Sequence, residues 1–240
     1  MTLDGLEREL NNRFHKKPSP KVNFVRYADD FIVTAAYKET LEYGVLPVIQ
    51  SFLEERGLEL SNEKTKITHV EEGFDFLGQT MRKFNGKLII QPAKKNTLTF
   101  MSNVRQIIQA NKQATAGNLI LQLNPVIRGW ANFHQHVASK KTFGSVDYAI
   151  FKTLWQWAKR RHPRKGKRWI KDKYFKVYNH RNWLFTGTVL SKDGTSKAIH
   201  LFSAAATPIQ RHIKVKGLAN PYDPQWTAYF TSRQRKTTRH

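Results

Sequence analysis

The spacing of apolar and polar positions divides the chain into a first part of alternating strands and helices and a later part that is mainly helical. Apolar residues recur at intervals of three and four over residues 3–14, which predicts an amphipathic helix. Residues 24–33 follow a different pattern, because two short apolar runs rich in β-branched and aromatic residues flank a pair of acids. This pattern predicts a strand, a tight turn and a second strand.

Further elements are predicted up to residue 92. One face of residues 38–57 is apolar and indicates a helix, in which Pro47 is expected to cause a kink or a late start and Gly57 to follow the last turn. Residues 58–68 are interpreted as a short strand, a turn and another strand. The dipeptide Asn85-Gly86 predicts the turn of a β-hairpin.

The pattern after residue 92 is typical of helices. An amphipathic helix is expected around residues 98–108, ended by Ala116-Gly117, and a second, long helix with an aromatic seam is expected over residues 143–157. Beyond them, apolar runs on either side of residues 192–194 suggest a hairpin.

The composition excludes several classes of protein. With 15 Phe, 8 Tyr and 6 Trp in 240 residues, the chain has enough aromatic surface for the core of one or two domains and is not a disordered polyelectrolyte. No apolar run approaches the ~18 residues of a membrane-spanning helix, so no membrane partner is expected. The absence of cysteine excludes a disulfide framework and a Cys-based zinc site, and favours an intracellular compartment.

The formal net charge of +23 points to a polyanionic partner, for which nucleic acid is the default. This charge is unevenly distributed along the chain. Residues 1–120 contain 17 Lys and Arg against 14 Asp and Glu, whereas residues 121–240 contain 24 against 4. The first half therefore has the charge balance of an ordinary folded domain, and the second half has that of a surface for phosphates.

The densest cluster of cations, residues 159–173, is called the basic segment below. Nine of its fifteen residues are Lys or Arg and one is acidic. A charge run is usually a solvated face, but this run is one-sided and contains Trp169. Cations hold a phosphate backbone while aromatic rings stack on unpaired bases. The basic segment, expected to be a loop between helices around Pro163 and Gly166, is therefore the strongest physical candidate for RNA binding.

Asp29 and Asp30 carry the candidate chemistry of the first part. Adjacent carboxylates at a hairpin tip repel each other, so the arrangement is most stable when cations are bound. Carboxylate oxygens suit Mg²⁺, and two-metal phosphoryl transfer needs such a clamp. The alternative interpretation is an ordinary turn, because Asp is common in turns.

The whole string Tyr27-Ala28-Asp29-Asp30 between apolar strands resembles the active-site hairpin of reverse transcriptases, in particular those encoded by group II introns. The resemblance implies that Asp29 and Asp30 bind the metal ions. It also implies that Tyr27 and Ala28 form the neighbouring nucleotide pocket, beside the primer end and the incoming nucleotide.

Two later stretches are similar to the last palm motifs of this family. They are residues 57–68, which contain Glu-Lys-Thr-Lys, and residues 73–78, which read Gly-Phe-Asp-Phe-Leu-Gly. Their order and spacing after the acidic hairpin both fit the family. The resemblance implies that Phe76, Leu77 and Gly78 support the primer strand.

Residues 119–169 resemble the maturase-specific region, domain X, of intron-encoded proteins, through Leu-Asn-Pro-Val-Ile-Arg-Gly-Trp-Ala-Asn-Phe at 123–133 and Trp-Ala-Lys-Arg-Arg-His-Pro at 157–163. In that family the region is a helical thumb that packs on the template–primer duplex and binds intron RNA to promote splicing. Residues 221–230 resemble a segment that leads toward DNA binding in longer members, which implies a DNA target. The residues assigned to RNA binding are Arg128, Lys159, Arg160, Arg161, Arg164, Lys165, Lys167 and Arg168.

These features together predict an α+β protein with three parts. Residues 1–91 are expected to form the C-terminal part of a reverse-transcriptase palm made of antiparallel hairpins and helices, residues 92–165 a helical thumb or maturase domain, and residues 166–240 a basic, irregular extension that binds DNA or RNA. The family pattern also includes fingers and a third metal-binding aspartate on an earlier strand, for which the residues before Pro18 leave no room. The two-metal Mg²⁺ site is therefore expected to be incomplete in this chain.

The function implied is that of the C-terminal portion of a group II intron reverse transcriptase/maturase. Such a chain binds intron RNA to assist splicing and contributes its metal site to RNA-directed DNA synthesis when a separate N-terminal half complements it, in a bacterial cytoplasm or an organelle. One alternative is a polymerase-inactive maturase remnant that acts only as an RNA-binding splicing factor. Another is a decayed reading frame whose product does not fold cooperatively.

Overall fold

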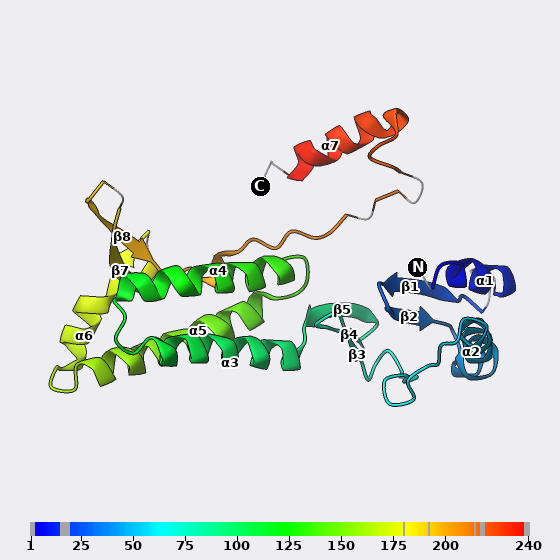
Figure 1. Cartoon of the computed structure of the whole chain (residues 1–240), viewed down its shortest axis with the longest axis horizontal. Coiled ribbons are helices and arrows are strands. Elements are labelled where there is room, and N and C mark those ends of the chain that lie inside the picture. The colour runs from blue at the N-terminus through cyan, green and yellow to red at the C-terminus, as the bar shows by residue number, and fades with distance from the viewer. Residues whose placement is uncertain are drawn as a thin grey trace. The chain divides into compact units, whose positions relative to one another are not determined.

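The structure is a computed structural model that describes residues 3–14, 20–179, 181–191, 193–213, 215–216 and 219–237 (Figure 1). These residues form helices and small antiparallel sheets, which confirms the mixed α and β composition expected from the sequence. The chain divides into two compact units, Met1–Phe74 and Asp75–His240. Within the described ranges, none of the helices combines the length and the apolar composition that crossing a membrane requires.

The first unit contains a β-hairpin and helical segments on either side of it in sequence. They are α1 (Leu6–Arg13), β1 (Asn23–Tyr27), β2 (Asp30–Thr34), the π-helical turn η1 (Thr40–Val45) and α2 (Leu46–Glu54). The two helices and the hairpin predicted for this part are confirmed. Pro47 is the second residue of α2, which continues directly from η1, and Gly57 follows the helix with a φ of +66°.

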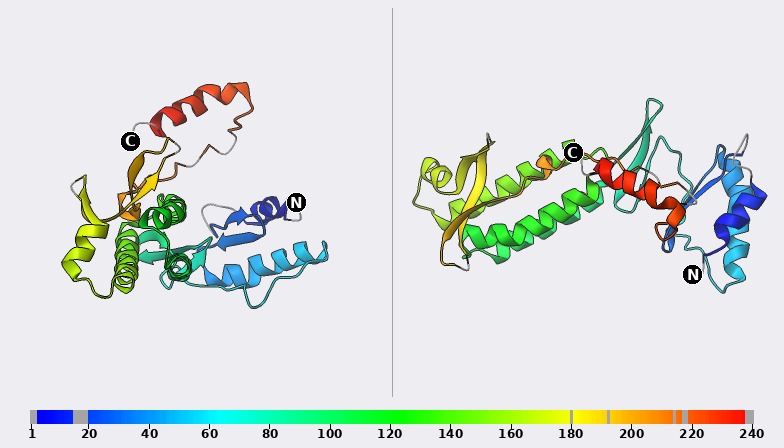
Figure 2. Two further views of the ribbon diagram at one scale, coloured as in Figure 1. Left: turned by 60° about the vertical axis from the view of Figure 1, so that its left-hand side comes forward. Right: turned by 90° about the horizontal axis from the view of Figure 1, so that it is seen from above.

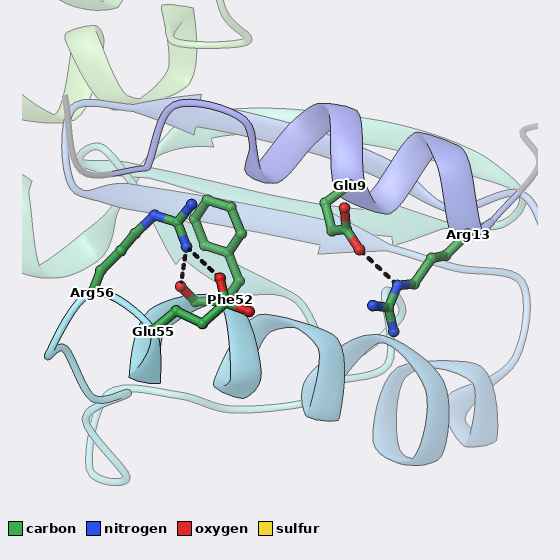
Figure 3. Close-up of polar contacts among 5 residues, drawn as sticks. All are labelled: Glu9, Arg13, Phe52, Glu55 and Arg56. Carbon is green, nitrogen blue, oxygen red and sulfur yellow. Dashed lines mark hydrogen bonds and ion pairs between the residues drawn. The ribbon is translucent and has the colours of Figure 1, made fainter.

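The core of the first unit lies between the apolar faces of α1 and α2. Leu6 and Leu10 of α1 are fully buried in one cluster with Ile49 and Phe52 of α2. Figure 3 shows how the end of α2 is finished: Nη1 of Arg56 donates to the carbonyl oxygen of Phe52 at 2.6 Å. The guanidinium carbon of Arg56 lies 3.6 Å from the centroid of the Phe52 ring, so that a cation–π contact covers this side of the core.

The strand–turn–strand arrangement expected for residues 58–68 is wrong. The turn exists, since the N–H of Lys64 donates to the carbonyl oxygen of Ser61, but no strand flanks it in this fully described stretch. Leu58 and Ile67, two of the apolar residues of this stretch, are exposed. With so little apolar surface to bury, two short strands are not stable in water.

The second unit contains two three-stranded sheets and a helical bundle. The strands are β3 (Phe74–Phe76), which begins at the last residue of the first unit, β4 (Gln79–Phe84), β5 (Lys87–Pro92), β6 (Phe175–Tyr178), β7 (Arg181–Leu190) and β8 (Ser196–His200). The helices are α3 (Lys94–Ala110), α4 (Ala116–His134), α5 (Lys140–Arg161), α6 (Lys167–Tyr174) and α7 (Thr227–Thr237), with 3₁₀ turns η2 (Ala204–Ala206) and η3 (Pro224–Trp226). The sheet orders are β3-β4-β5 and β6-β7-β8, and the predicted Asn85-Gly86 turn joins β4 to β5.

One core joins α3, α4 and α5 to the second sheet. The three helices lie side by side, with β7 against α4 (Figures 1 and 2). The aromatic seam predicted for α5 faces inward, and Phe143 and Leu154 are fully buried. Phe175 of β6 and Phe185 of β7 belong to the same cluster. The predicted boundary at residue 165 therefore falls inside a single core, and the part expected to be irregular begins with a helix and a sheet.

The interpretation of Ala116-Gly117 as a helix breaker is wrong. Helix α3 already ends at Ala110, and Oγ1 of Thr115 caps the start of α4 by accepting from the N–H of Asn118 at 3.2 Å. Gly117 lies instead where β7 crosses α4, because a Cβ atom on Gly117 would lie 2.1 Å from the carbonyl oxygen of Thr188. The glycine therefore permits a close backbone approach between a helix and a strand.

Candidate functional site

The two acids lie at the tip of the β1–β2 hairpin, as predicted. Tyr27 pairs with Asp30 at the last rung of the ladder, and Ala28 and Asp29 form the two-residue loop. Ala28 has a φ of +51°, a left-handed conformation that costs roughly 1–2 kcal/mol for a residue with a Cβ atom. Tyr27, Asp29 and Asp30 are all exposed, so the tight loop presents both carboxylates to solvent.

One face of the β1–β2 hairpin packs against the rest of the first unit. Phe24 and Phe31, with ring centroids 5.6 Å apart, pack on the core between α1 and α2. Arg26 ties the hairpin to the residues before α1, since its Nη2 donates to Oδ1 of Asp4 at 2.9 Å. Val25 on the other face is 58% exposed. The acids therefore stand at the end of a hairpin whose second face is open.

The two carboxylates at the hairpin tip are suitable ligands for a hard divalent cation, but they are too few to complete its coordination. Asp29 and Asp30 supply carboxylate oxygens, and Mg²⁺ is commonly held by one or two carboxylates together with waters and substrate phosphates. Within the described ranges, no group of three acidic or histidine side chains is arranged to hold a metal ion. The two acids are thus suited to a site whose remaining ligands, such as substrate phosphates, come from outside the described residues.

The residues expected to support the primer strand form a second tight turn, in the second unit. Phe76 ends β3, and Leu77 and Gly78, with φ values of +49° and +74°, lead into β4. The turn packs on the start of α3, because the N–H of Ala93 donates to the carbonyl oxygen of Gly78 at 3.0 Å. A Cβ atom on Gly78 would lie 3.0 Å from Nδ2 of Asn96. Leu77 is the exposed residue of this turn.

The basic segment comprises the last turn of α5, a loop and most of α6. The loop is limited to residues 162–166, shorter than predicted, because Arg161 still lies in α5 and Lys167 begins α6. The segment's predicted RNA-binding residues are all exposed, and they are Lys159, Arg160, Arg161, Arg164, Lys165, Lys167 and Arg168. Helices on both sides of the loop therefore carry cations that face solvent.

Trp169 lies among these cations. It is 37% exposed, and the Nζ atoms of Lys165 and Lys173 lie 5.4 and 4.8 Å from its ring centroid. His162 packs edge-on against the same ring, with centroids 4.7 Å apart. Desolvation, and then the positive charges of Lys173, Arg161 and Lys165, lower the pKa of His162. The part of this lowering that comes from the three cations reflects a positive local field, which a bound polyanion would reduce.

Two of the predicted RNA-binding residues also have contacts inside the protein. Nη1 of Arg161 donates to the carbonyl oxygen of Ala114 at 2.5 Å, and Nη2 donates to that of Gln113 at 3.2 Å. This side chain therefore ties the end of α5 to the α3–α4 turn. The guanidinium carbon of Arg128, which is exposed on α4, lies 5.0 Å from the ring centroid of Phe202.

Comparisons with known proteins identify both parts of the chain. The family model for reverse transcriptase (RNA-dependent DNA polymerase) matches residues 1–81, and the model for the group II intron maturase-specific domain matches residues 97–175. A Schizosaccharomyces pombe protein described as an uncharacterized 91 kDa protein in the cob intron is 28% identical over 168 residues. The chain belongs to the intron-encoded reverse transcriptases and maturases. The alignment covers 60% of the chain and 21% of the relative, so the chain spans about a fifth of that protein's length.

In this reverse transcriptase/maturase chain, the candidate metal-binding residues and the candidate RNA-binding residues fall in different family matches. The acidic hairpin and the Leu77-Gly78 turn lie inside the reverse-transcriptase match, and reverse transcriptases as a family use Mg²⁺. Arg128 and the whole basic segment lie inside the maturase-specific match, which covers residues 97–175. The residues expected to bind metal thus lie in the reverse-transcriptase match, and those expected to bind RNA lie in the maturase-specific match.

The maturase-specific match also contains a groove that the sequence patterns did not reveal. It lies between α3 and α5, has a volume of about 770 Å³, and is called the α3–α5 groove below. No acidic side chain is among its described lining residues. Lys152, Gln156 and Arg160 recur every four residues along one side of α5, a spacing that a search for cations adjacent in sequence does not detect. The cations of the groove are Arg105, Lys112, Lys152, Arg160 and Arg161.

Proposed function

We propose that this chain binds group II intron RNA through the basic segment, Arg128 and the α3–α5 groove, and that the binding assists splicing of the intron. The observation that carries the proposal is the exposure of the basic segment's cations in a region that matches the maturase-specific domain. Phosphates are the natural counter-ions of so one-sided a surface. Trp169 offers a stacking face for an unpaired base beside these cations.

We further propose that the acidic hairpin contributes to RNA-directed DNA synthesis when the N-terminal half of a reverse transcriptase complements it and brings the rest of the active site. Asp29 and Asp30 would hold Mg²⁺, which when bound stabilises charge on the phosphate under attack. The template–primer duplex and a DNA target are the partners in this reaction. The other residues proposed to contribute are Tyr27 and Ala28 beside the nucleotide, and Phe76, Leu77 and Gly78 under the primer strand.

The proposal gives each part of the chain a role. Residues 1–91 act as part of the palm, residues 92–165 as the thumb or maturase region, and residues 166–240 as an extension along the nucleic acid. The boundaries between these roles differ from those between packed parts of the structure, because α6 and the second sheet share a core with α3, α4 and α5. A protein with this function works where its intron RNA is made, in a bacterial cytoplasm or an organelle.

An electrostatic experiment tests the RNA-binding surface. The affinity of the chain for a group II intron transcript is measured across a range of salt concentrations. The same titration is repeated for a variant in which four exposed cations become Gln, namely Arg160, Arg164, Lys165 and Arg168. Each phosphate contact contributes roughly 0.7 to 0.9 to the slope of log affinity against log salt. The variant should therefore bind more weakly and lose about three from that slope.

A matched control removes the same charge elsewhere. It replaces Lys83, Lys87, Lys94 and Lys95 by Gln, and all four are exposed outside the basic segment. This variant should keep nearly the whole salt slope of the wild-type chain. A flat salt response of the wild-type chain, or an equal loss in the two variants, would contradict the proposed surface.

A second experiment separates a chain that supports DNA synthesis from a remnant that only assists splicing. In the first case, Asp29→Ala combined with Asp30→Ala abolishes primer extension by the chain together with a supplied N-terminal reverse-transcriptase half. In the second case, no primer extension occurs and splicing assistance is insensitive to the same substitutions. Primer extension that survives the double substitution would remove the metal-binding assignment.

A further inference from the structure

A second cavity, of about 640 Å³, lies within the second unit between α5, the second sheet and η2. Its lining includes Phe151 of α5, Phe175 of β6 and Trp183 of β7, whose ring centroids lie 5.3 to 6.3 Å from one another. This cavity is called the aromatic pocket below. Its volume is in the range of pockets that hold small organic ligands.

Trp183 has a backbone conformation that strains a bulky residue. Its φ is +63°, in the left-handed region that such side chains rarely adopt. It lies close to a shift in the β6–β7 register between Lys176 and Tyr178, and irregularities of this kind redirect side chains next to functional sites. Trp183 remains 45% exposed although it contacts other rings of the pocket. The strand therefore offers a partly open indole face.

Cations from separate parts of the chain surround this pocket. Nζ of Lys171, a member of the basic segment, lies 5.2 Å from the ring centroid of Trp183. The guanidinium carbon of Arg128 lies 5.0 Å from the centroid of Phe202, another lining ring. Arg181 belongs to the lining itself. An apolar, aromatic cavity is thus bordered by three positive charges.

Asp147 is the one acid among the described lining residues, against the three cations at the border. The two carboxylate oxygens of Asp147 accept from Oγ of Ser203 at 2.6 Å and from the N–H groups of Ala204 and Ala205 at 2.8 and 3.0 Å. Both oxygens therefore hold the η2 turn, and the border of the pocket keeps an excess of positive charge. An apolar peptide would gain little from the surrounding cations, whereas a nucleotide presents a π-face and a phosphate together.

We propose that the aromatic pocket receives one unpaired base of the bound RNA, with the flanking phosphates against Lys171, Arg128 and Arg181. The inference rests on the proposed RNA-binding function and adds to it a site for a single-stranded nucleotide next to the basic segment. The base stacks on Trp183, and the amide of Asn182, also in the lining, can donate to or accept from the base edge.

The experiment compares two probes on the full chain. One probe is single-stranded RNA of about ten nucleotides, and the other has the same phosphates and sugars but no bases. Trp183→Ala should weaken binding of the intact RNA by about five- to 150-fold, the range for loss of one base–aromatic stack. Binding of the abasic probe should not change. Trp183→Phe keeps a ring and should restore most of the affinity.

Phe84 on β4 provides the matched control. It is an exposed aromatic residue outside the pocket, with the guanidinium carbon of Arg82 4.6 Å from its ring centroid. Phe84→Ala should leave the affinity for both probes unchanged. If thermal unfolding shows that Trp183→Ala does not fold, the conservative Trp183→Phe gives the answer instead. RNA carrying 2-aminopurine should then be quenched less by this variant than by the wild-type chain.

The possible failures are distinguishable. Intact RNA that binds equally well to the wild-type chain, Trp183→Ala and Phe84→Ala, or equal 2-aminopurine quenching by the wild-type chain and Trp183→Phe, would overturn the pocket assignment and leave the salt-dependent RNA binding in place. A pocket that serves an apolar protein segment would give this same result. A wild-type chain that binds neither probe would instead refute the proposed RNA-binding function.

Discussion

The buried imidazole of His134 leads to a specific prediction about stability and pH. His134 ends α4 and is fully buried, with Nε2 3.2 Å from Oδ1 of Asn96. Because that oxygen can only accept, Nε2 carries the proton. Nδ1 has no hydrogen-bond partner within the described part of the chain. Burial, and to a smaller extent the charge of His136, lower the pKa of His134 from 6.5 to about 4.

The lowered pKa makes the folded state less stable in acid. Below pH 6.5 the unfolded chain takes up a proton at His134 that the folded chain does not bind, so stability is lost as the pH falls and the loss is complete near pH 4. Each pKa unit corresponds to about 1.4 kcal/mol. The expected loss is therefore about 2 kcal/mol at pH 5 and about 3 kcal/mol in full, a large part of the ~5–15 kcal/mol that stabilises a typical domain.

Urea unfolding followed by tryptophan fluorescence at pH 7 and pH 5 measures this loss. All six Trp residues lie in the second unit, so the signal reports on the unit that contains His134. His134→Gln keeps an N–H donor near the position of Nε2 but cannot be protonated, and should reduce the acid-induced loss by about 2 kcal/mol. The control His212→Gln removes an exposed histidine and should retain the wild-type dependence. The same dependence on pH in all three proteins would refute the assignment to His134.

Two further predictions concern the close packing at Gly117 and the different roles of Arg160 and Arg161. Gly117→Ala should destabilise the second unit by about 1–3 kcal/mol in the same urea assay, because its Cβ atom would lie 2.1 Å from the carbonyl oxygen of Thr188. Gly129→Ala, on the same helix with open space around it, should instead be neutral or stabilising by up to about 1 kcal/mol. Arg160→Gln should weaken RNA binding at an unchanged urea midpoint, whereas Arg161→Gln should lower the midpoint, and the reverse pattern would contradict the hydrogen bonds assigned to Arg161.

Local features of the fold could be predicted because their signals are adjacent in sequence. The Asn85-Gly86 turn, the acidic hairpin and the seam of α5 each depend on a few neighbouring residues whose spacing fixes one type of element. The basic segment was also visible as a run of cations. Signals of this kind place candidate residues on strands, helices and loops without reference to the remainder of the fold.

Features that depend on distant residues could not be predicted in the same way. The local sequence around Gly117 predicts a helix breaker. The glycine is needed instead because β7, some seventy residues later, crosses the helix there. The α3–α5 groove joins Arg105 to Arg160 across two helices, and the aromatic pocket joins Phe151 to Trp183. In residues 58–68 the local pattern predicted strands that do not form, because these residues have no surface to pack against. In each case tertiary packing decides what the local pattern leaves open.

The few acids of residues 121–240 mainly cap turns. It contains four acidic residues, and three of them cap turns. Asp147 accepts from N–H groups at η2, and Asp193 and Asp223 accept from the N–H groups of Thr195 and Gln225, each at 3.0 Å. These carboxylates stabilise local structure and keep their charge, but four acids against 24 cations leave a large positive excess, and the repulsion among these cations lowers the stability of the folded unit. Because a polyanion that binds only the folded unit removes this repulsion, RNA binding as proposed here would also stabilise the second unit.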